Sequence, residues 1–396
     1  MSASASLEKS IPTWPRPAGG ELPALEEVLS SGAWGSATGQ LVRDFEQQFA
    51  RYHSARHGIA CANGTVALAA ALAVLDLPPG SEVVVPSYTF FATAAAPALL
   101  GFVPVFCDVT PDGYLLDPAA LEAVIGPDTA AVIPVHLAGA LCDLDAILAI
   151  ARRHGLAVIE DAAQASGGSY RGRGIPSGDL ATFSFQSSKN LASGEGGAIL
   201  TNDDRLAEGL FGYLNVGRIP GGAWYQHETF GLNLRLSEFQ GAVLTAQFSA
   251  FPQLQQRRTA NAARLHDLLR GTPGLDLPPV GFDDGTVHGQ HLFLIRFPGL
   301  GAARRNRLLS LLQQGGLRHA SSGYIPLHRN QPLLEKARGN AAAAGRTFRE
   351  PSCPHTDQRV EETIWLPQPV LLAEPEVLDQ VAELITTSLA TVLEER

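Results

Sequence analysis

The sequence predicts an α/β protein in which a mainly parallel sheet is covered by helices and a smaller C-terminal α/β domain follows. The first observation is an alternation, over residues 57–203, of short apolar runs rich in β-branched residues with longer runs rich in Ala and Leu. Such alternation is typical of βαβ crossovers and of strands buried on both faces. The second observation is the composition: 45% hydrophobic and 17% charged residues favour packed cores over disorder.

The elements of this region follow one another in a regular order of strand and helix. Uninterrupted helical patterns are expected over residues 64–75 and 144–155. Strands are expected over residues 57–62, 82–87, 103–109, 130–137, 156–162, 181–186 and 197–203. Ligands of such sheets bind beyond the carboxyl ends of the strands, so the loops that follow these runs are the candidate sites.

The uncharged run at residues 87–106 is long enough to suggest a membrane helix. Pro97, Gly101 and Pro104 interrupt it, and we therefore expect a loop, a short buried helix and a strand instead. No membrane partner is expected.

The character of the sequence changes in its second half. An amphipathic helical stretch covers residues 236–271 and is expected to break at Pro252. The 396 residues also exceed the size of one compact core. We therefore expect an N-terminal arm and a large domain in residues 1–250 and a small C-terminal domain in residues 251–396.

Charge and cysteine usage exclude several classes of function. The formal net charge of −10 argues against a nucleic-acid partner, since no basic patch offsets it. The four cysteines lie far apart, without the spacing of a zinc site or a redox pair, so we expect reduced thiols and no metal. The N-terminus has no apolar signal segment, and the chain is expected to be cytoplasmic.

The run ANGTVALAAAL at residues 62–72 is a candidate phosphate site. Gly64 lets backbone N–H groups approach an anion, and the helix that starts there adds partial positive charge. Taken alone, an ordinary helix start with Asn63 or Thr65 as its N-cap is the simpler interpretation.

The run IEDAAQ at residues 159–164 places acidic groups at the end of a predicted strand. A carboxylate at that edge, Asp161, can hold a protonated pyridine nitrogen and so make an aromatic cofactor ring an electron sink. Gln164, one turn further on, could reach the phenolic oxygen of that ring. Standing alone, Asp161 could equally cap the next helix.

Lys189 lies in SFQSSKNLASGEGGAIL, a polar and Gly-rich loop between two predicted strands. A lysine amine attacks an aldehyde when its surroundings lower its pKa. Ser184 could offer its hydroxyl to the same phosphate, and Phe90 in SYTFFAT could stack on an aromatic ring. A solvated loop lysine and a core phenylalanine are the alternatives.

This order of phosphate cradle, aromatic ring, aspartate and lysine resembles the fold-type I, aspartate-aminotransferase-like enzymes that depend on pyridoxal 5′-phosphate (PLP). The similarity narrows to the DegT/DnrJ/EryC1/StrS family of sugar aminotransferases and extends from about Pro15 to the C-terminus. It is carried by GTVAL, PSYTFFAT, PVHLAGALCDLDAI, EDAAQASGGSYRGRGIPSGD, FSFQSSKNLASGEGG and GLNLRLSEFQGA.

The resemblance implies roles for particular residues in these motifs. It implies that Lys189 forms the Schiff base with PLP, Asp161 pairs with the pyridine nitrogen, Gln164 lies beside the ring oxygen and Phe90 stacks on the ring. The phosphate would be held by Gly64, Thr65 and Ser184. Asn233 would reach the phosphate in the neighbouring subunit, which implies a homodimer with shared active sites; without the resemblance, Asn233 is simply a helix cap.

The resemblance implies an aminotransferase that moves an amino group from glutamate or glutamine to a keto-sugar, most commonly nucleotide-linked, in amino-sugar biosynthesis. The alternative acceptor is a keto-cyclitol of the scyllo-inosose type, because FSFQSSK and CPHTDQRVEETIWLPQPVLL are similar to that branch. A non-catalytic PLP-binding regulator is the alternative from another class, although no DNA-binding extension is present. A lyase or desulfurase would need a mobile cysteine, for which only Cys353 is a candidate.

The substrate side is less well defined by the sequence. Asn63, Ala138 and Val216 depart from residues frequent in the family, and the last two could reshape the substrate pocket. Candidate substrate residues are Trp34, Arg218, Arg235, Tyr324 and His328. Plain packing or a surface position is the alternative for each.

Overall fold

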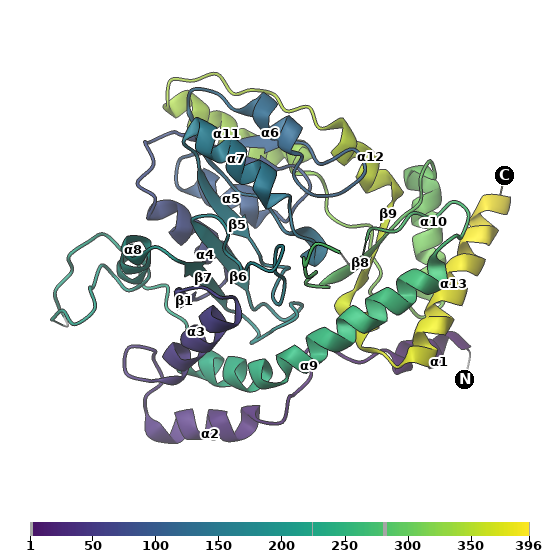
Figure 1. Cartoon of the computed structure of the whole chain (residues 1–396), viewed down its shortest axis with the longest axis horizontal. Coiled ribbons are helices and arrows are strands. Elements are labelled where there is room, and N and C mark those ends of the chain that lie inside the picture. Colours follow the sequence, from purple (N-terminus) through teal and green to yellow (C-terminus); the bar gives the residue numbers. More distant parts are fainter. Residues whose placement is uncertain (1–2, 224, 280–282, 396) are drawn as a thin grey trace.

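The computed structural model describes residues 3–223, 225–279 and 283–395. Its centre is a seven-stranded sheet of order β1-β7-β6-β5-β4-β2-β3 (Figure 1). The strands are β1 (His57–Cys61), β2 (Glu82–Pro86), β3 (Val103–Cys107), β4 (Thr129–Val132), β5 (Ala157–Asp161), β6 (Leu180–Ser184) and β7 (Gly197–Thr201). β7 is antiparallel to both of its neighbours, and the other pairs are parallel. The predicted α/β fold with a mainly parallel sheet is confirmed.

Helices cover both faces of this sheet because its strands are apolar on both sides. In β2, Val84 belongs to one core, whereas Val83 and Val85 belong to the other. The first core is closed by α3 (Leu41–Tyr52), α6 (Pro118–Val124), α7 (Leu144–His154) and part of α9 (Glu238–Leu269). The second core is closed by α4 (Gly64–Ala73), α5 (Ala92–Leu99), α8 (Asp204–Leu214) and α11 (Gln331–Ala343).

The helix predicted over residues 236–271 does not break at Pro252, which corrects the sequence expectation. α9 runs through the proline and begins at a capping box formed by Ser237 and Gln240. The helix packs against α2 and α3 near its start and against α13 further on, so tertiary contacts hold both sides of the proline. A long rigid helix therefore joins the two parts of the molecule (Figure 1).

A second, two-stranded antiparallel sheet lies beyond α9. It pairs β8 (Leu292–Arg296) with β9 (Thr363–Pro367). Around it lie α1 (Ala3–Ser10), α10 (Gly301–Gln314), α12 (Pro354–Glu362) and α13 (Pro375–Glu394), whereas α2 (Glu21–Ser31) lies along the first half of α9 (Figure 1). Among the described residues, three short 3₁₀ turns complete the elements: η1 (Leu137–Gly139), η2 (Leu327–Arg329) and η3 (Gln368–Leu372).

One segment of the C-terminal part returns to the large sheet. α11 packs on α5 and β3, and Asn340 anchors it by donating to the carbonyl oxygens of Ala98 and Phe102, at 2.8 Å each. This packing extends the second core with residues from far along the sequence.

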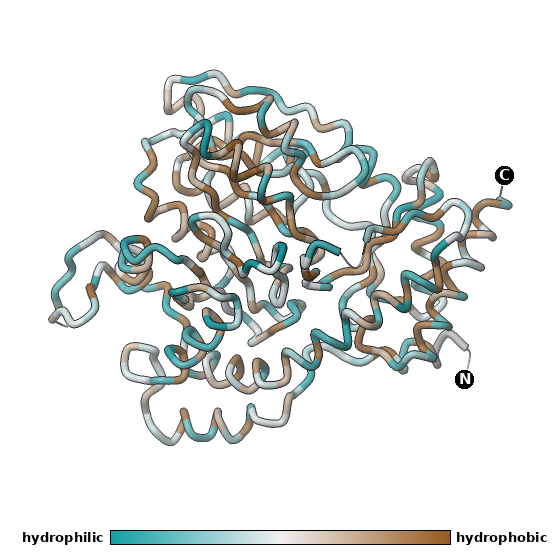
Figure 2. The backbone as a smooth tube through the Cα atoms, viewed as in Figure 1, coloured by the Kyte–Doolittle hydropathy of each residue, from teal (hydrophilic) through white to brown (hydrophobic). Residues whose placement is uncertain are grey.

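The uncharged run at residues 87–106 forms a loop, α5 and β3, as predicted. Figure 2 shows hydrophobic stretches gathered along the strands of the central sheet. Within the part of the chain that the structure describes, no helix combines the length and hydropathy needed to span a bilayer. The four cysteines are free and buried.

Candidate active site

The carboxyl ends of β5 and β6 bring the predicted acid and hydroxyl to one edge of the sheet. Asp161 ends β5 and pairs with Thr182, and Ser184 ends β6. The loop from β1 into α4 reaches the same edge. An ideal Cβ on Gly64 would lie only 2.8 Å from the Cβ of Ser184, so glycine is required for this close approach.

The predicted phosphate cradle is the first turn of α4. Asn63 caps this helix, because its side-chain oxygen accepts the N–H of Val66 at 3.0 Å. Thr65 is exposed in the next position. The backbone N–H groups of this turn, the hydroxyl of Ser184 and the positive end of the helix dipole suit an anion.

Asp161 is a buried carboxylate, only 5% exposed. Its Oδ2 accepts a hydrogen bond from the hydroxyl of Thr93 at 2.8 Å, and its Oδ1 accepts the N–H of Ala163 at 3.2 Å. Burial raises the pKa of Asp161, and the hydroxyl of Thr93 acts in the opposite direction. No helix begins directly after β5, so Asp161 is not a helix cap.

Lys189 lies in the loop between β6 and β7, facing the acid. Burial lowers the pKa of Lys189 to about 8, and the charge of Asp161 opposes that shift. The loop is held from outside: the carbonyl oxygen of Lys189 accepts the indole N–H of Trp14 at 2.9 Å, and that of Asn190 accepts a guanidinium N–H of Arg258 at 3.3 Å. These contacts fix the backbone of the loop, and the lowered pKa favours the neutral, nucleophilic form of the Lys189 amine.

Gln164 connects this edge to the C-terminal part of the chain. Its Oε1 accepts the N–H of Ala138 at 2.6 Å, and its Nε2 donates to the hydroxyl of Tyr324 at 2.8 Å. The ring of Tyr324 lies 5.8 Å from that of Phe90 and 4.7 Å from that of Trp365, centre to centre. Phe90 is 56% exposed, which leaves its face free to stack on a flat ligand.

We refer to Gly64, Asp161, Gln164, Ser184 and Lys189 as the strand-edge cluster. The cluster comes from the last residues of β5 and β6 and from the segments that follow β1, β5 and β6, and the structure brings these together with Phe90 and Tyr324. Sequence reasoning missed Thr93, Trp14 and Trp365. The available signal for Thr93, the second residue of α5, was a hydroxyl spaced about one helical turn after Phe90.

His328 is packed into the protein and does not line an open substrate wall. Its Nδ1 contacts the hydroxyl of Ser87, and its Nε2 lies 2.9 Å from a carboxylate oxygen of Asp357. Burial lowers its pKa. Both ring nitrogens are thus engaged, and the substrate role predicted for His328 has no support from this geometry.

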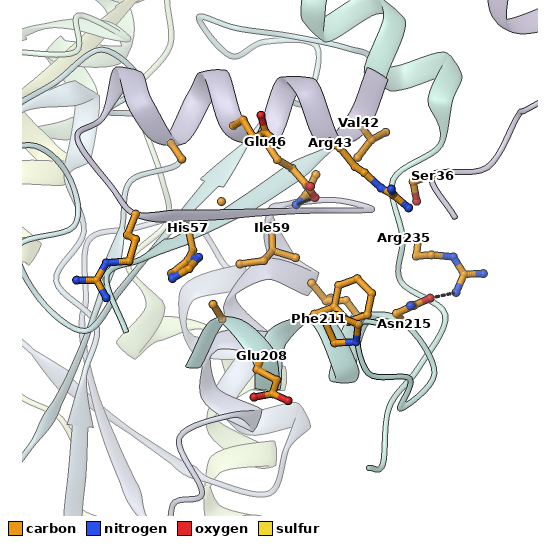
Figure 3. Close-up of a pocket in the computed structure, with 18 of the residues that line it drawn as sticks. Ser36, Val42, Arg43, Glu46, His57, Ile59, Glu208, Phe211, Asn215 and Arg235 are labelled. Atoms are coloured by element: carbon orange, nitrogen blue, oxygen red, sulfur yellow. Dashed lines mark hydrogen bonds between the residues drawn. The ribbon is translucent and has the colours of Figure 1, made fainter. Parts of the chain in front are cut away.

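Of the other substrate candidates, Tyr324 contacts the strand-edge cluster through Gln164, whereas Arg218, Arg235 and Trp34 lie among other residues. Arg218 and Arg235 line a hollow of about 820 Å³ between α3, β1 and α8, which we refer to as the α3–α8 hollow (Figure 3). Arg235 donates to the side-chain oxygen of Asn215 at 2.8 Å. Trp34 is half-exposed and packs beside Phe239, with ring centres 5.7 Å apart.

Asn233 is exposed on the segment that leads into the α3–α8 hollow. Its neighbour Leu234 accepts the backbone N–H of Ala62 at 2.9 Å, just before the cradle. Asn233 forms a bridge with Asn215, and Ser237 rather than Asn233 caps α9.

The strand-edge cluster fits PLP by its donor set. A glycine-dependent helix N-terminus suits the phosphate, a buried carboxylate suits the ring nitrogen, and an amine of lowered pKa suits the aldehyde. PLP, when bound, supplies an electron sink for breaking bonds at the carbon next to an amino group. The fold and this cluster define the class: PLP-dependent aminotransferases of fold type I.

The chain belongs to the DegT/DnrJ/EryC1/StrS aminotransferase family, which it matches over residues 18–386. It is 38% identical to a pleiotropic regulatory protein of Geobacillus stearothermophilus (91% of this chain, 92% of the relative). It is also 38% identical to dTDP-3-amino-3,4,6-trideoxy-alpha-D-glucose transaminase of Streptomyces venezuelae (91% and 90%). To L-glutamine:2-deoxy-scyllo-inosose aminotransferase of Streptomyces fradiae it is 41% identical (70% and 68%).

The structural comparison agrees with the family. The fold is similar to the crystal structure of 3-amino-5-hydroxybenzoic acid synthase, with a TM-score of 0.87, 34% identity and coverage of 96% of this chain and 99% of that one. The resemblance read from the motifs is therefore confirmed at the level of family and fold.

Proposed function

We propose that this aminotransferase moves an amino group from glutamate or glutamine to a nucleotide-linked keto-sugar in amino-sugar biosynthesis. The observation that carries the proposal is that Lys189, whose pKa is lowered to about 8, lies within electrostatic reach of the buried Asp161, beside a glycine-dependent cradle. The similarity to the Streptomyces venezuelae transaminase supports the acceptor class.

In this proposal each residue of the strand-edge cluster has one task. Gly64, Thr65 and Ser184 bind the phosphate, and Asp161 keeps the ring nitrogen protonated. Lys189 Nζ would hold and move the proton released from the donor's α-carbon, acting as base and then as acid, and PLP would supply the electron sink. A pKa of about 8, below the ordinary value of 10.5, leaves more neutral amine near neutral pH than an exposed lysine has, while the protonated form stays available as the acid.

The first test replaces the amine. Lys189→Ala should abolish transamination and the visible absorption band of the PLP-loaded protein, while leaving its far-UV circular dichroism unchanged. Lys336→Ala, which removes a lysine from α11, is the matched control and should retain both. A K189A protein that still aminated ketones at the wild-type rate would sink the proposal.

The acceptor class is tested separately from the chemistry. PLP-loaded enzyme is first treated with glutamate or glutamine and then offered either a nucleotide-linked keto-sugar or scyllo-inosose, and amine formation is followed by mass spectrometry. We expect the nucleotide sugar to be aminated. Preference for scyllo-inosose would instead favour the keto-cyclitol alternative, which the similarity to the Streptomyces fradiae enzyme supports.

A regulatory function is the second candidate, because one relative is a pleiotropic regulatory protein. A regulator would bind PLP without turnover. The visible band of the loaded protein should then survive addition of every amino donor, whereas an aminotransferase loses it with the correct donor.

We also propose a homodimer in which Asn233 serves the partner's phosphate site. The exposure of Asn233 and its place beside the α3–α8 hollow support this arrangement. Mixing inactive K189A with inactive Asn233→Ala should restore about a quarter of wild-type activity, because half of the dimers are mixed and each has one complete site. If Asn233 served its own chain, mixing would restore nothing.

We propose that the chain divides near residue 250, which the two core clusters around the large sheet and the third around β8 and β9 support. We also place the reaction in the cytoplasm, in line with four free thiols.

A further inference from the structure

The carboxylate of Asp161 is held on both of its oxygens by groups of the chain itself. Oδ2 accepts the hydroxyl proton of Thr93 at 2.8 Å, and Oδ1 accepts the N–H of Ala163 at 3.2 Å. Asp161 is only 5% exposed, so bulk water cannot replace a missing donor. The orientation of the carboxylate therefore depends on these two contacts.

Behind Thr93 lies a second buried hydroxyl. The Oγ1 atoms of Thr89 and Thr93 are 3.0 Å apart, and their residues are 1% and 0% exposed. Because the single hydroxyl proton of Thr93 is directed to Asp161, Thr89 must be the donor to Thr93. The result is a short chain of hydroxyl dipoles that points at the acid and favours its charged form.

We propose that Thr93, supported by Thr89, is a positioning residue that holds Asp161 ionised and oriented toward the cationic ring nitrogen of PLP. The inference rests on the role proposed above for Asp161 and adds a residue of the PSYTFFAT motif to which the sequence analysis gave no role.

The electrostatic setting explains why such a donor is needed. Burial raises the pKa of Asp161, and the hydroxyl of Thr93 is the strongest of the groups that lower it. Lys189 and His136 also face the acid and lower its pKa by their charges, and the hydroxyl of Tyr324 lies close enough to be affected by Asp161. A neutral amine at Lys189 removes part of that help, which leaves the hydroxyl of Thr93 as a constant contribution.

The position of Thr93 also links two parts of the site. Thr93 lies three residues after Phe90, and its backbone N–H donates to the carbonyl oxygen of Phe90 at 3.2 Å. One turn at the start of α5 thus sets both the aromatic face and the hydroxyl that holds the acid. A shift of α5 would disturb both together.

The test is Thr93→Val, which keeps the branched shape and removes the donor. We expect apo protein to bind PLP about tenfold more weakly by fluorescence titration, and kcat of the donor half-reaction to fall about ten- to a hundredfold with little change in KM. The acid limb of the pH profile should move upward by about one pH unit, because an acid of higher pKa becomes protonated at higher pH. Thr93→Ser should restore all three values.

Matched variants decide between outcomes. Thr201→Val removes an equally buried hydroxyl, which donates to the carbonyl oxygen of Asp179 at 2.8 Å, and should leave PLP binding unchanged. Thr89→Val should give a smaller effect in the same direction as Thr93→Val. If Thr93→Val does not fold, Thr93→Cys, with a weak thiol donor, should fall between wild type and the expected loss.

The inference and the proposed function fail in different ways. Thr93→Val behaving like Thr201→Val in PLP affinity and pH profile would overturn the positioning role while leaving Asp161 in place. Asp161→Asn with undiminished PLP binding and turnover would instead overturn the role of Asp161, and with it the proposed function.

Discussion

The strand-edge cluster and the α3–α8 hollow differ in how much of a site one chain can build. The strand-edge cluster is largely buried, and hydrogen bonds within the chain hold it in place. Thr93 donates to Asp161, Gln164 donates to Tyr324, and Trp14 donates to the carbonyl oxygen of Lys189. The α3–α8 hollow is wide and lined by charged side chains that include Arg218 and Arg235 (Figure 3). Burial lowers the pKa of Arg235, and the neighbouring charge of Arg218 lowers it further.

We infer from this difference that the strand-edge cluster carries the cofactor chemistry and that the α3–α8 hollow affects which substrate binds. A cofactor needs a fixed geometry, which buried strand ends and short hydrogen bonds provide. The α3–α8 hollow is open, and the planar guanidinium groups of Arg218 and Arg235 suit an anionic ligand there, beside acidic side chains that line the same hollow. Changes in the strand-edge cluster should therefore abolish chemistry, and changes in the hollow should alter substrate affinity.

The largest effect is expected from Asp161→Asn. Loss of the charge leaves the ring nitrogen without its ion partner, and we expect kcat to fall about a thousandfold or more, by analogy with other buried charge partners in active sites. Asp179→Asn, at the opposite end of β5 where its carboxylate accepts the N–H of Val158 at 2.8 Å, is the control and should retain activity. Stopped-flow measurement of the donor half-reaction distinguishes the two.

The next effect is steric and falls on the cradle. Gly64→Ala places a Cβ 2.8 Å from that of Ser184, so we expect PLP affinity to fall about tenfold or more, even though alanine suits a helix better. Gly339→Ala, in α11 with open space around the new Cβ, should instead stabilise the protein by up to about 1 kcal/mol. Equal PLP affinity of Gly64→Ala and wild type would remove the cradle from the site.

The sequence predicted the strand-edge cluster better than the hollow, for a physical reason. Gly64 and Lys189 follow predicted strands, Asp161 lies at the end of one, and the ends of parallel strands meet at one edge of the sheet. His328 and Arg235 do not lie at the ends of strands, so no local pattern predicts their neighbours, which depend on tertiary packing. The unbroken passage of α9 through Pro252 was likewise beyond a local signal, because helices packed at both ends hold it together.

A third prediction concerns the hollow. Arg235→Ala should raise KM for an anionic acceptor about tenfold while leaving PLP affinity and the donor half-reaction unchanged. Arg205→Ala, an exposed change at the start of α8, serves as the control. A loss of PLP affinity in Arg235→Ala would contradict the division between a cofactor site and a substrate-binding hollow, since it would connect the hollow to the cofactor.

A fourth prediction concerns stability without cofactor. The pKa of Lys189 is lowered on folding, so the unfolded chain binds more protons between pH 8 and its ordinary pKa of 10.5, and stability from this group rises with pH across that window. Below it, the buried charge costs stability. The free energy of unfolding of apo Lys189→Met, measured by urea titration, should therefore exceed that of wild type by about 1–3 kcal/mol at pH 7 and by less at pH 10. An apo variant less stable than wild type at both pH values would contradict the lowered pKa assigned to this lysine.

The smallest effect is expected from Tyr324→Phe, which removes one hydroxyl from the bracing of the strand-edge cluster. Gln164 keeps its contact with the N–H of Ala138 and loses only its partner on Tyr324, so we expect kcat to change about two- to fivefold and PLP affinity less. The rings of Phe90 and Trp365 continue to hold the phenyl group in place. Gln164→Ala should have a larger effect than Tyr324→Phe, and the double variant should be no worse than Gln164→Ala alone, because the tyrosine acts through the glutamine. Additive losses in that cycle would show that Tyr324 contacts a substrate directly and belongs to the variable side of the site.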